Sequence, residues 1–147
     1  SAVQNALFVC ELCEREVPVH AGTDGPLERR LETAQHIHGS DGFGDIGLDL
    51  KGRRPAAENA VRAIVRTAAA HEGELEIVTL GPLTNLALAL REDPGLSGRV
   101  RRCVVMGGTG RGPGNITPVA EFNIWVDPEA AQIVFDSDLE IELVGCE

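Results

Sequence analysis

Residues 75–106 read LEIVTLGPLTNLALALREDPGLSGRVRRCVVM and place a strand, a helix and a second strand in direct succession. Residues 75–80 and 100–106 are short apolar runs typical of buried strands, and residues 82–91 have the apolar spacing of a helix. Strands that alternate with helices predict a mostly parallel sheet with helices on both faces, so the expected fold class is α/β. Binding sites in such sheets gather at the carboxyl ends of strands, where Leu80 and Met106 are expected.

The flanking sequence continues this alternation. Asp127 is expected to cap a helix that Pro128 opens. Residues 20–55 hold many Gly, Asp and His residues with little periodicity, and irregular segments of this kind often carry function. Without an internal repeat, residues 1–147 are expected to form a single domain. Further helices are expected at residues 2–14, near 27–36, at 56–71 and from 128 to about 136, and further strands at 17–19 and 140–144.

The composition is ordinary for a globular protein and argues against two classes of partner. Hydrophobic residues make up 43% of the 147 residues, and 23 acidic against 13 basic residues give a formal charge of −10. This acidic balance disfavours nucleic acid, whose phosphate backbone requires clustered Lys and Arg. No apolar run approaches the roughly 20 residues that span a bilayer, and no signal peptide is evident. We therefore expect neither a nucleic-acid nor a membrane partner.

Two of the four cysteines, Cys10 and Cys13, form a C-x-x-C pair. Such a pair is found in redox and metal sites, but no second pair at metal-ligand spacing accompanies it. In a helix over residues 2–14 both thiols share a face with Ala6, and Cys103 lies in an apolar strand. Buried, reduced thiols and a cytoplasmic location are therefore expected.

The stretch GNITPVAEFN at residues 114–123 concentrates polar side chains among apolar neighbours. In an extended chain, Glu121 and Asn123 would point to one side and Phe122 to the other. A carboxylate beside carboxamides suits vicinal hydroxyls, as on a sugar, and Asn115 adds another amide. The alternative is a polar loop whose side chains cap its own backbone, which is common for Asn.

Three motifs, in order along the chain, resemble the inosine-uridine preferring nucleoside hydrolase family. The strongest is VVMGG at residues 104–108 followed by GNITPVAEFNIWVDPEAA at 114–131. LGPLTNLALA at residues 80–89 is similar to a second signature of the family. VPVHAG at residues 17–22, followed by His-Gly and Asp-Gly at 38–39 and 41–42, is a weaker match.

The resemblance implies a fold, a reaction and a set of site residues. The family cleaves the N-glycosidic bond of ribonucleosides with a bound Ca²⁺, an attacking water and an oxocarbenium-like transition state. It also implies that several residues bind substrate and that the backbone carbonyl of Leu80 ligates calcium. Core packing is the alternative role for Met106 and Phe122, and a loop histidine bonded to backbone is the alternative for His38. The implied substrate-binding residues are Asn115, Glu121, Asn123, Met106, Phe122 and His38.

The chain departs from the family pattern where the family keeps its metal and its base. The N-terminal D-x-D-x-x-x-D-D cluster, the Gly-Asn motif after it and the C-terminal His-Asp pair have no counterpart here. No residue of this chain is therefore assigned as catalytic, and Ca²⁺ is implied by the family alone. Asp41 and Asp45 lack the further ligands of a calcium loop, so surface turns are expected there. We expect a single nucleoside hydrolase-like domain that is incomplete relative to the family.

These observations leave three hypotheses. The chain is a nucleoside hydrolase or a fragment of one, a non-catalytic ribose- or nucleoside-binding relative, or a structural remnant of the family. The expected partner is a small-molecule ribonucleoside. A homo-oligomer is also expected, because relatives assemble and an incomplete sheet leaves free strand edges that pair with other chains.

Overall fold

The computed structural model describes residues 2–145, which form two compact units. The first unit comprises residues 2–22 and 32–60, and the second comprises residues 23–31 and 61–145. The second contains the whole sheet and therefore the strand ends at which a site was expected.

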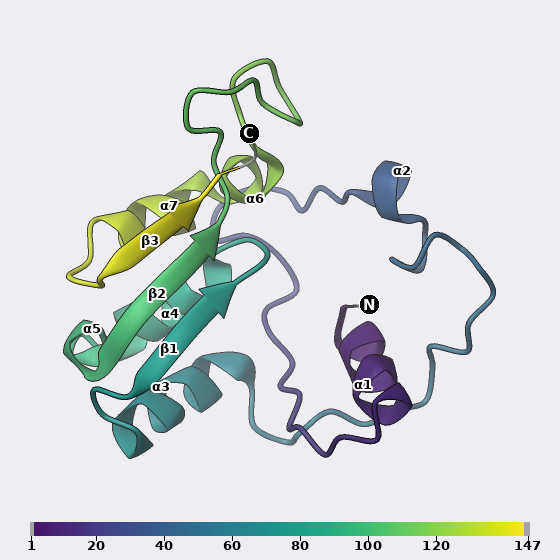
Figure 1. Cartoon of the computed structure of the whole chain (residues 1–147), viewed down its shortest axis with the longest axis horizontal. Helices are drawn as coiled ribbons and strands as arrows, with labels where there is room; N and C mark the ends of the chain where they lie inside the picture. Colours follow the sequence, from purple (N-terminus) through teal and green to yellow (C-terminus); the bar gives the residue numbers. More distant parts are fainter. Residues whose placement is uncertain (1, 146–147) are drawn as a thin grey trace. The chain divides into compact units, whose positions relative to one another are not determined.

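The second unit is built on a three-stranded parallel sheet in the order β1-β2-β3 (Figure 1). Its strands are β1 (Leu75–Thr79), β2 (Val100–Met106) and β3 (Ile141–Val144). Thr79 of β1 pairs with Val105 of β2, which pairs in turn with Leu143 of β3. The parallel sheet and the α/β class are confirmed, and all three strands lie where the apolar runs predicted them.

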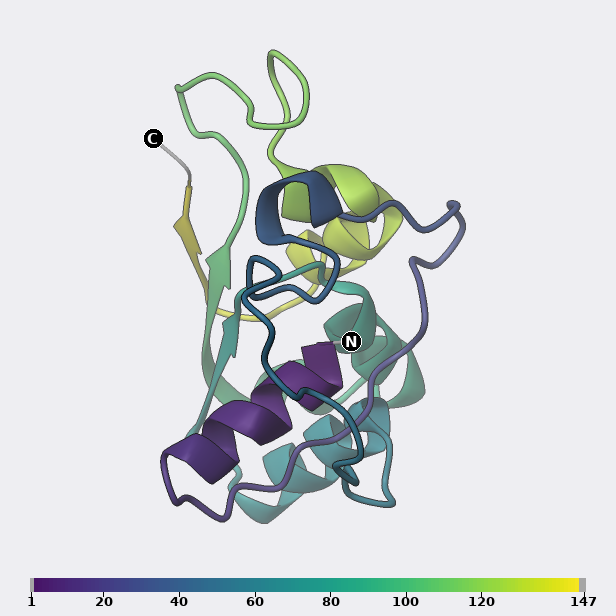
Figure 2. The ribbon, with the colours of Figure 1, turned by 90° about the vertical axis from the view of Figure 1, so that its right-hand side faces the viewer.

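The helices of this unit lie on one face of the sheet (Figures 1 and 2), whereas the sequence predicted helices on both faces. On the opposite face, Val78 and Val144 are exposed, and Arg102 bonds to Glu76 and Glu142 across the three strands. The helices are α3 (Ala60–Ala70), α4 (Thr84–Glu92), α5 (Leu96–Arg99), α6 (Phe122–Val126) and α7 (Pro128–Phe135).

Alanines allow the helices to approach one another and the sheet closely. α4 contacts α7, with Ala87, Ala130 and Ala131 buried at positions where a larger side chain would separate the helices. Cys103 and Val105 of β2 are fully buried beneath them. Burial raises the pKa of the Cys103 thiol to about 11, so this sulfur stays protonated and inert at neutral pH.

The first unit contains α1 (Ala2–Leu12) and the short helix α2 (Gln35–His38). α1 is held by reciprocal bonds, since the Gln4 amide donates to the Arg53 carbonyl and accepts from the Arg53 N–H. The rings of Phe8 and Phe43 meet edge to face with their centroids 6.1 Å apart. No residue of α1 is fully buried, so its predicted apolar stripe is only partly covered.

Three expectations about this part of the chain are wrong. Residues 17–19 form no strand, because Pro18 lacks an N–H and the adjacent pairing is a single bridge between His20 and Ala56. The helix near 27–36 is reduced to the four residues of α2. Cys13 is exposed and Cys10 is half-buried, so neither thiol is part of a core.

No helix among residues 2–145 combines the length and the apolar character that crossing a membrane requires.

Ion pairs on the second unit make its stability dependent on pH. Arg29 forms a bidentate pair with Glu129, its Nε lying 3.1 and 3.0 Å from the two carboxylate oxygens and its Nη2 2.9 Å from Oε1. Hydrogen bonding to Arg29 lowers the pKa of Glu129 below its usual value. The Arg102 guanidinium lowers the pKa of Glu76 in the same way.

We expect the free energy of unfolding to fall as the pH drops below the ordinary glutamate pKa of 4.5. A carboxylate with a lowered folded-state pKa contributes stability that is complete above its unfolded pKa and lost as the pH falls through the folded value. Urea unfolding from neutral pH to about pH 3 measures this loss. Glu129→Gln should reduce the acid-dependent loss, whereas Asp138→Asn, at an exposed residue, should leave the wild-type slope. Equal slopes for wild type and Glu129→Gln would contradict the assignment.

Candidate functional site

Glu121 lies at the carboxyl end of β2 and forms the N-cap of α6. Its Oε1 accepts the N–H of Asn123 at 2.9 Å, and its Oε2 accepts those of Ile124 at 3.2 Å and Gly108 at 3.1 Å. Only 3% of the residue is exposed. The carboxylate therefore joins the loop after β2 to the start of α6 and is held rigidly by three main-chain donors.

Gly107 lies against this carboxylate for a steric reason. A Cβ at this position would lie 3.3 Å from Oε2 of Glu121 and 3.2 Å from Cδ1 of Ile124, which is tighter than ordinary packing. A glycine after Met106 thus allows the chain to pass close to the buried acid. Its N–H also continues the ladder by donating to the Val144 carbonyl at 3.0 Å.

Asn123 is buried in the first turn of α6 and reaches back to the last residue of β2. Its Nδ2 donates to the Met106 carbonyl at 3.3 Å and lies 3.5 Å from the Met106 sulfur. Met106 itself is half-buried. The amide therefore fixes α6 against the end of the strand.

Asn115 is exposed and closes a tight loop that precedes α6. Its Oδ1 accepts the N–H of Phe122 at 2.8 Å, while its own N–H donates to the Ala120 carbonyl at 3.0 Å. Gly114 opens this loop, and a Cβ there would lie 2.1 to 2.3 Å from backbone atoms of Thr117 and Ala120. Only glycine is compatible with this loop conformation, because the obstructing atoms are main chain.

The structure corrects the expected backbone around these groups. Residues 121–123 do not form an extended run with alternating side chains, because Glu121 is the last extended residue and the helix begins at Phe122. The polar groups are instead brought together by helix capping. Each also has a main-chain partner, as the alternative interpretation of a self-capping loop predicts. Asn115, Glu121 and Asn123 nevertheless belong to one hydrogen-bonded cluster with Met106 and Phe122, which we call the β2 cluster.

Aromatic side chains lie beside the β2 cluster on α6. Phe122 is half-buried, and its ring centroid lies 6.4 Å from that of Trp125. From the sequence alone, Phe122 was expected either to pack in the core or to line a binding pocket. Partial exposure of both rings leaves an aromatic surface next to the polar groups, which suits a planar base or a sugar face.

Leu80 follows β1 at the same end of the sheet, one residue beyond the Thr79–Val105 pair. The residue is 73% exposed. Ca²⁺ takes six to eight oxygen ligands, usually including carboxylates, so a single carbonyl cannot hold it. Among residues 2–145 no three His, Cys, Asp or Glu side chains gather closely enough for a metal ion. This part of the chain does not by itself fit a calcium site.

Asp41 and Asp45 stabilise turns in the first unit, as their spacing indicated. Asp41 accepts the N–H of Phe43 and of Asp45 at 2.7 and 3.0 Å. Hydrogen bonds from the Ser40 hydroxyl and N–H lower the pKa of Asp45. His38 ends α2 nearby in the same unit, with an exposed side chain and a carbonyl that accepts the Gly44 N–H.

The sequence did not reveal a second polar cluster, centred on Asp127. This carboxylate is fully buried, and it accepts the Thr84 hydroxyl at 2.5 Å, the Leu27 N–H at 3.0 Å and the Ala130 N–H at 3.1 Å. The capping of α7 was predicted, but the bonds to α4 and to residue 27 were not. The available sequence signal was Thr84 next to Asn85, in the helix that follows a strand. A Thr hydroxyl buried there needs a hydrogen-bond partner, which would have pointed to a second polar cluster.

The second unit is therefore an α/β protein whose polar side chains gather at the carboxyl ends of parallel strands, the usual position of a ligand site. Comparison with known proteins identifies the family: the inosine-uridine preferring nucleoside hydrolase model matches residues 1–147, and the chain belongs to that family.

Individual relatives agree with this assignment. A probable uridine nucleosidase 1 from Oryza sativa subsp. japonica is 43% identical over 147 residues, covering 99% of this chain and 45% of the relative. The pyrimidine-specific ribonucleoside hydrolase RihB of Escherichia coli O9:H4 (strain HS) is 40% identical over 141 residues, covering 96% and 45%. The structure of a purine-preferring ribonucleoside hydrolase from Gardnerella vaginalis superposes with a TM-score of 0.91 at 32% identity, covering 97% of this chain and 47% of that one. The chain thus spans about half the length of the relatives it matches.

Proposed function

We propose that this chain supplies the ribose-binding part of a nucleoside hydrolase, which cleaves the N-glycosidic bond of ribonucleosides to release ribose and free base. The observation that carries the proposal is the convergence of Asn115, Glu121 and Asn123 at the end of β2. Amide and carboxylate groups fixed by the backbone would meet sugar hydroxyls without first having to be ordered.

The β2 cluster retains hydrogen-bonding capacity for a ligand. A carboxylate offers about four acceptor sites, and the main chain occupies three of those on Glu121. The Asn115 side chain is exposed, and its amide has two donors in addition to the oxygen that binds Phe122. In this proposal Met106 and Phe122 line the pocket for the sugar and the base, and a role for His38 rests on the family motif alone.

Hydrolysis by the whole protein requires groups that the described residues do not gather. In a whole protein of this family, a bound Ca²⁺ would supply activation of the attacking water, and the Leu80 carbonyl would be one of its ligands. Water at neutral pH is a poor nucleophile without such activation. We therefore propose that residues 1–147 alone bind nucleosides without turning them over. Such binding would be purely non-covalent.

A structural role for the same residues is the second candidate. It is favoured by one observation, the three main-chain N–H groups that bind the Glu121 carboxylate. In that case the family signature would maintain the connection between β2 and α6 in a relative that no longer binds ribose.

Two further parts of the proposal concern the setting of the protein. A homo-oligomer is supported by the edge strands β1 and β3, each of which pairs on one side only within the described sheet. Such free edges are surfaces onto which other chains add.

A reducing, cytoplasmic location is supported by Cys10, Cys13 and Cys103, all free thiols.

We expect residues 1–147 to bind uridine or inosine, and Asn123→Ala to weaken that binding about 10- to 100-fold, since one or two hydrogen bonds to the sugar are lost. Calorimetric titration with uridine, inosine and free ribose measures the affinities. Gln132→Ala is the matched control, because it removes an exposed amide from α7 in the same unit. Thermal unfolding of both variants separates lost binding from lost folding.

The outcomes separate the candidate functions. Binding that weakens in Asn123→Ala but not in Gln132→Ala supports the ribose-binding proposal. No detectable affinity for any of the three ligands would leave the structural role. Hydrolysis of uridine or inosine by this chain that survives EDTA would contradict the calcium mechanism.

A further inference from the structure

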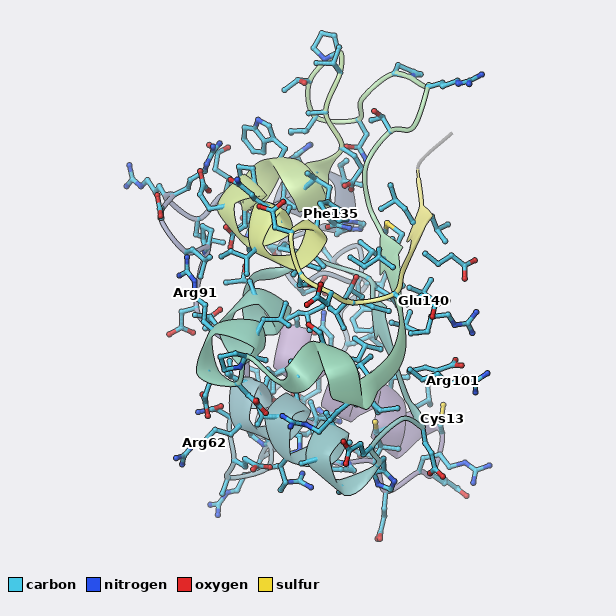
Figure 3. All side chains as sticks on the ribbon, turned by 90° about the vertical axis from the view of Figure 1, so that its left-hand side faces the viewer. Cys13, Arg62, Arg91, Arg101, Phe135 and Glu140 are labelled. Atoms are coloured by element: carbon cyan, nitrogen blue, oxygen red, sulfur yellow. The ribbon has the colours of Figure 1, made fainter. Side chains whose placement is uncertain are left out.

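The C-x-x-C pair lies at the end of α1, with Cys10 in its last turn and Cys13 one residue beyond it; the sequence predicted buried thiols here and the structure places accessible ones. Cys13 is exposed (Figure 3), whereas Cys10 is half-buried. Cys103 differs from both, because it is fully buried in the core of the other unit. The pair therefore makes little contribution to a core, and its chemistry is open to small molecules.

The backbone places the two thiols on one side of the helix. The Cys13 N–H donates to the Val9 carbonyl at 2.9 Å, so the helical hydrogen-bond pattern extends through residue 13. Residues three apart on a helix have Cβ atoms about 5–6 Å apart, whereas a disulfide requires roughly 3.5–4.5 Å. Approach of the thiols therefore needs a movement of about 1–2 Å, which a fraying helix end can supply.

The end of α1 is shaped in a way that allows this movement. The Arg15 N–H bonds to the Cys10 carbonyl at 2.9 Å and the Glu14 N–H bonds to the Glu11 carbonyl at 3.0 Å, which together form a Schellman motif. Glu14 is in the left-handed region with a φ of 51°, a conformation that glycine adopts more readily. The turn that carries the thiols thus ends at Glu14, a non-glycine residue in the left-handed region. It also contains a 3₁₀-type hydrogen bond, from the Glu14 N–H to the Glu11 carbonyl.

A surface cavity of about 520 Å³ opens beside the pair within the same unit. Cys10, Leu7 and Pro18 form part of its apolar lining, and Arg15 and Arg53 border it. This space leads to the half-buried thiol and is large enough for a small thiol compound. Glu11 and Glu16 also line this space, and Arg53 is already paired with Glu11, so Arg15 is the side chain proposed to bind a carboxylate of such a compound.

We propose that Cys10 and Cys13 are a reversible dithiol–disulfide pair that exchanges with low-molecular-weight disulfides such as oxidised glutathione. The Cys13 thiolate attacks one sulfur of the small disulfide, forming a mixed disulfide and releasing one small thiol. The Cys10 thiolate then attacks the Cys13 sulfur, forming the Cys10–Cys13 bond and releasing the second small thiol. One disulfide is broken and one is formed, the protein loses two hydrogens, and the oxidant becomes two thiols.

The test uses residues 1–147 carrying Cys146→Ser, because Cys146 lies outside the described residues. After incubation with oxidised glutathione, intact mass should show the loss of two hydrogens with no retained glutathione. The Cys10→Ser variant should stop at the mixed disulfide and keep one glutathione on Cys13. Maleimide should label Cys103 only after denaturation, because its thiol is buried.

Phenylarsine oxide, which bridges two neighbouring thiols, gives a second measurement that does not depend on oxidation. It should protect both Cys10 and Cys13 from maleimide in the parent protein and should fail to protect Cys13 in Cys10→Ser. Retention of glutathione by the parent protein, or linkage of two chains through Cys13 on a non-reducing gel, would overturn the proposal. So would equal arsenical protection in the two proteins.

Discussion

Asp127→Ala is expected to reduce the free energy of unfolding by about 3–4 kcal/mol, because three donors lose a buried anionic acceptor. Those donors are the Thr84 hydroxyl, the Leu27 N–H and the Ala130 N–H. They belong to α4, to the segment before Arg29 and to α7, so the substitution affects three parts of the unit together. Urea unfolding followed by circular dichroism measures the loss.

Two other variants make this expectation decisive. Asp127→Asn keeps the shape and one oxygen, so it should lose about 1–2 kcal/mol and still fold. Asp138→Ala removes an exposed carboxylate from the same unit and should change stability by less than about 0.5 kcal/mol. If Asp127→Ala were no less stable than Asp138→Ala, the carboxylate would not hold these elements together.

The elements that the sequence predicted well are those that local pattern determines. The strands at residues 75–79 and 100–106 follow from short apolar runs, of which the second forms the central strand of the parallel sheet. The start of α7 follows from an Asp before a Pro, since the Asp side chain accepts the Ala130 N–H and Pro needs no donor at the first helical position. Both depend on neighbours within a few residues.

The predictions that failed depend on contacts between distant residues or on competition between two local patterns. Residues 27–31 are not helical because the Leu27 N–H bonds to Asp127, which lies 100 residues away. No periodicity within residues 27–36 contains that information. Residues 121–123 look like an alternating strand, but a Glu that can cap a helix starts α6 at Phe122 instead.

The sequence indicated which residues to consider for the candidate site, but not how they are arranged. The family resemblance selected Asn115, Glu121 and Asn123, and the structure brings them together at the end of β2. The donors that hold Glu121 are main-chain groups of Gly108, Asn123 and Ile124. Every residue type except proline supplies such a donor, so sequence could not identify them.

Glu121→Ala is the second variant with a large expected effect. We expect a loss of about 2–3 kcal/mol in the free energy of unfolding, since α6 loses its N-cap and the Gly108 N–H loses its partner. Urea unfolding measures this loss. Glu142→Ala, which removes an exposed carboxylate from β3, serves as the control and should lose less than about 1 kcal/mol.

Glu121→Gln then separates the structural role of this carboxylate from a role in binding. The glutamine oxygen can replace Oε2 and accept the Gly108 and Ile124 N–H groups, but its NH₂ group would then face the Asn123 N–H. A stability loss of about 1–2 kcal/mol is expected, leaving the protein folded. If Glu121 also accepts a ribose hydroxyl, the affinity for uridine should fall by about tenfold or more at temperatures where the variant is fully folded.

The two roles are physically compatible because they use different acceptor sites on one carboxylate. Main-chain donors orient the group in its buried position, while Oε1, which accepts only the Asn123 N–H, keeps an acceptor site for a hydroxyl. A folded Glu121→Gln variant that binds uridine as tightly as the parent protein would assign the carboxylate to capping alone. A weakened affinity in that folded variant would show that the cap of α6 is also part of the sugar site.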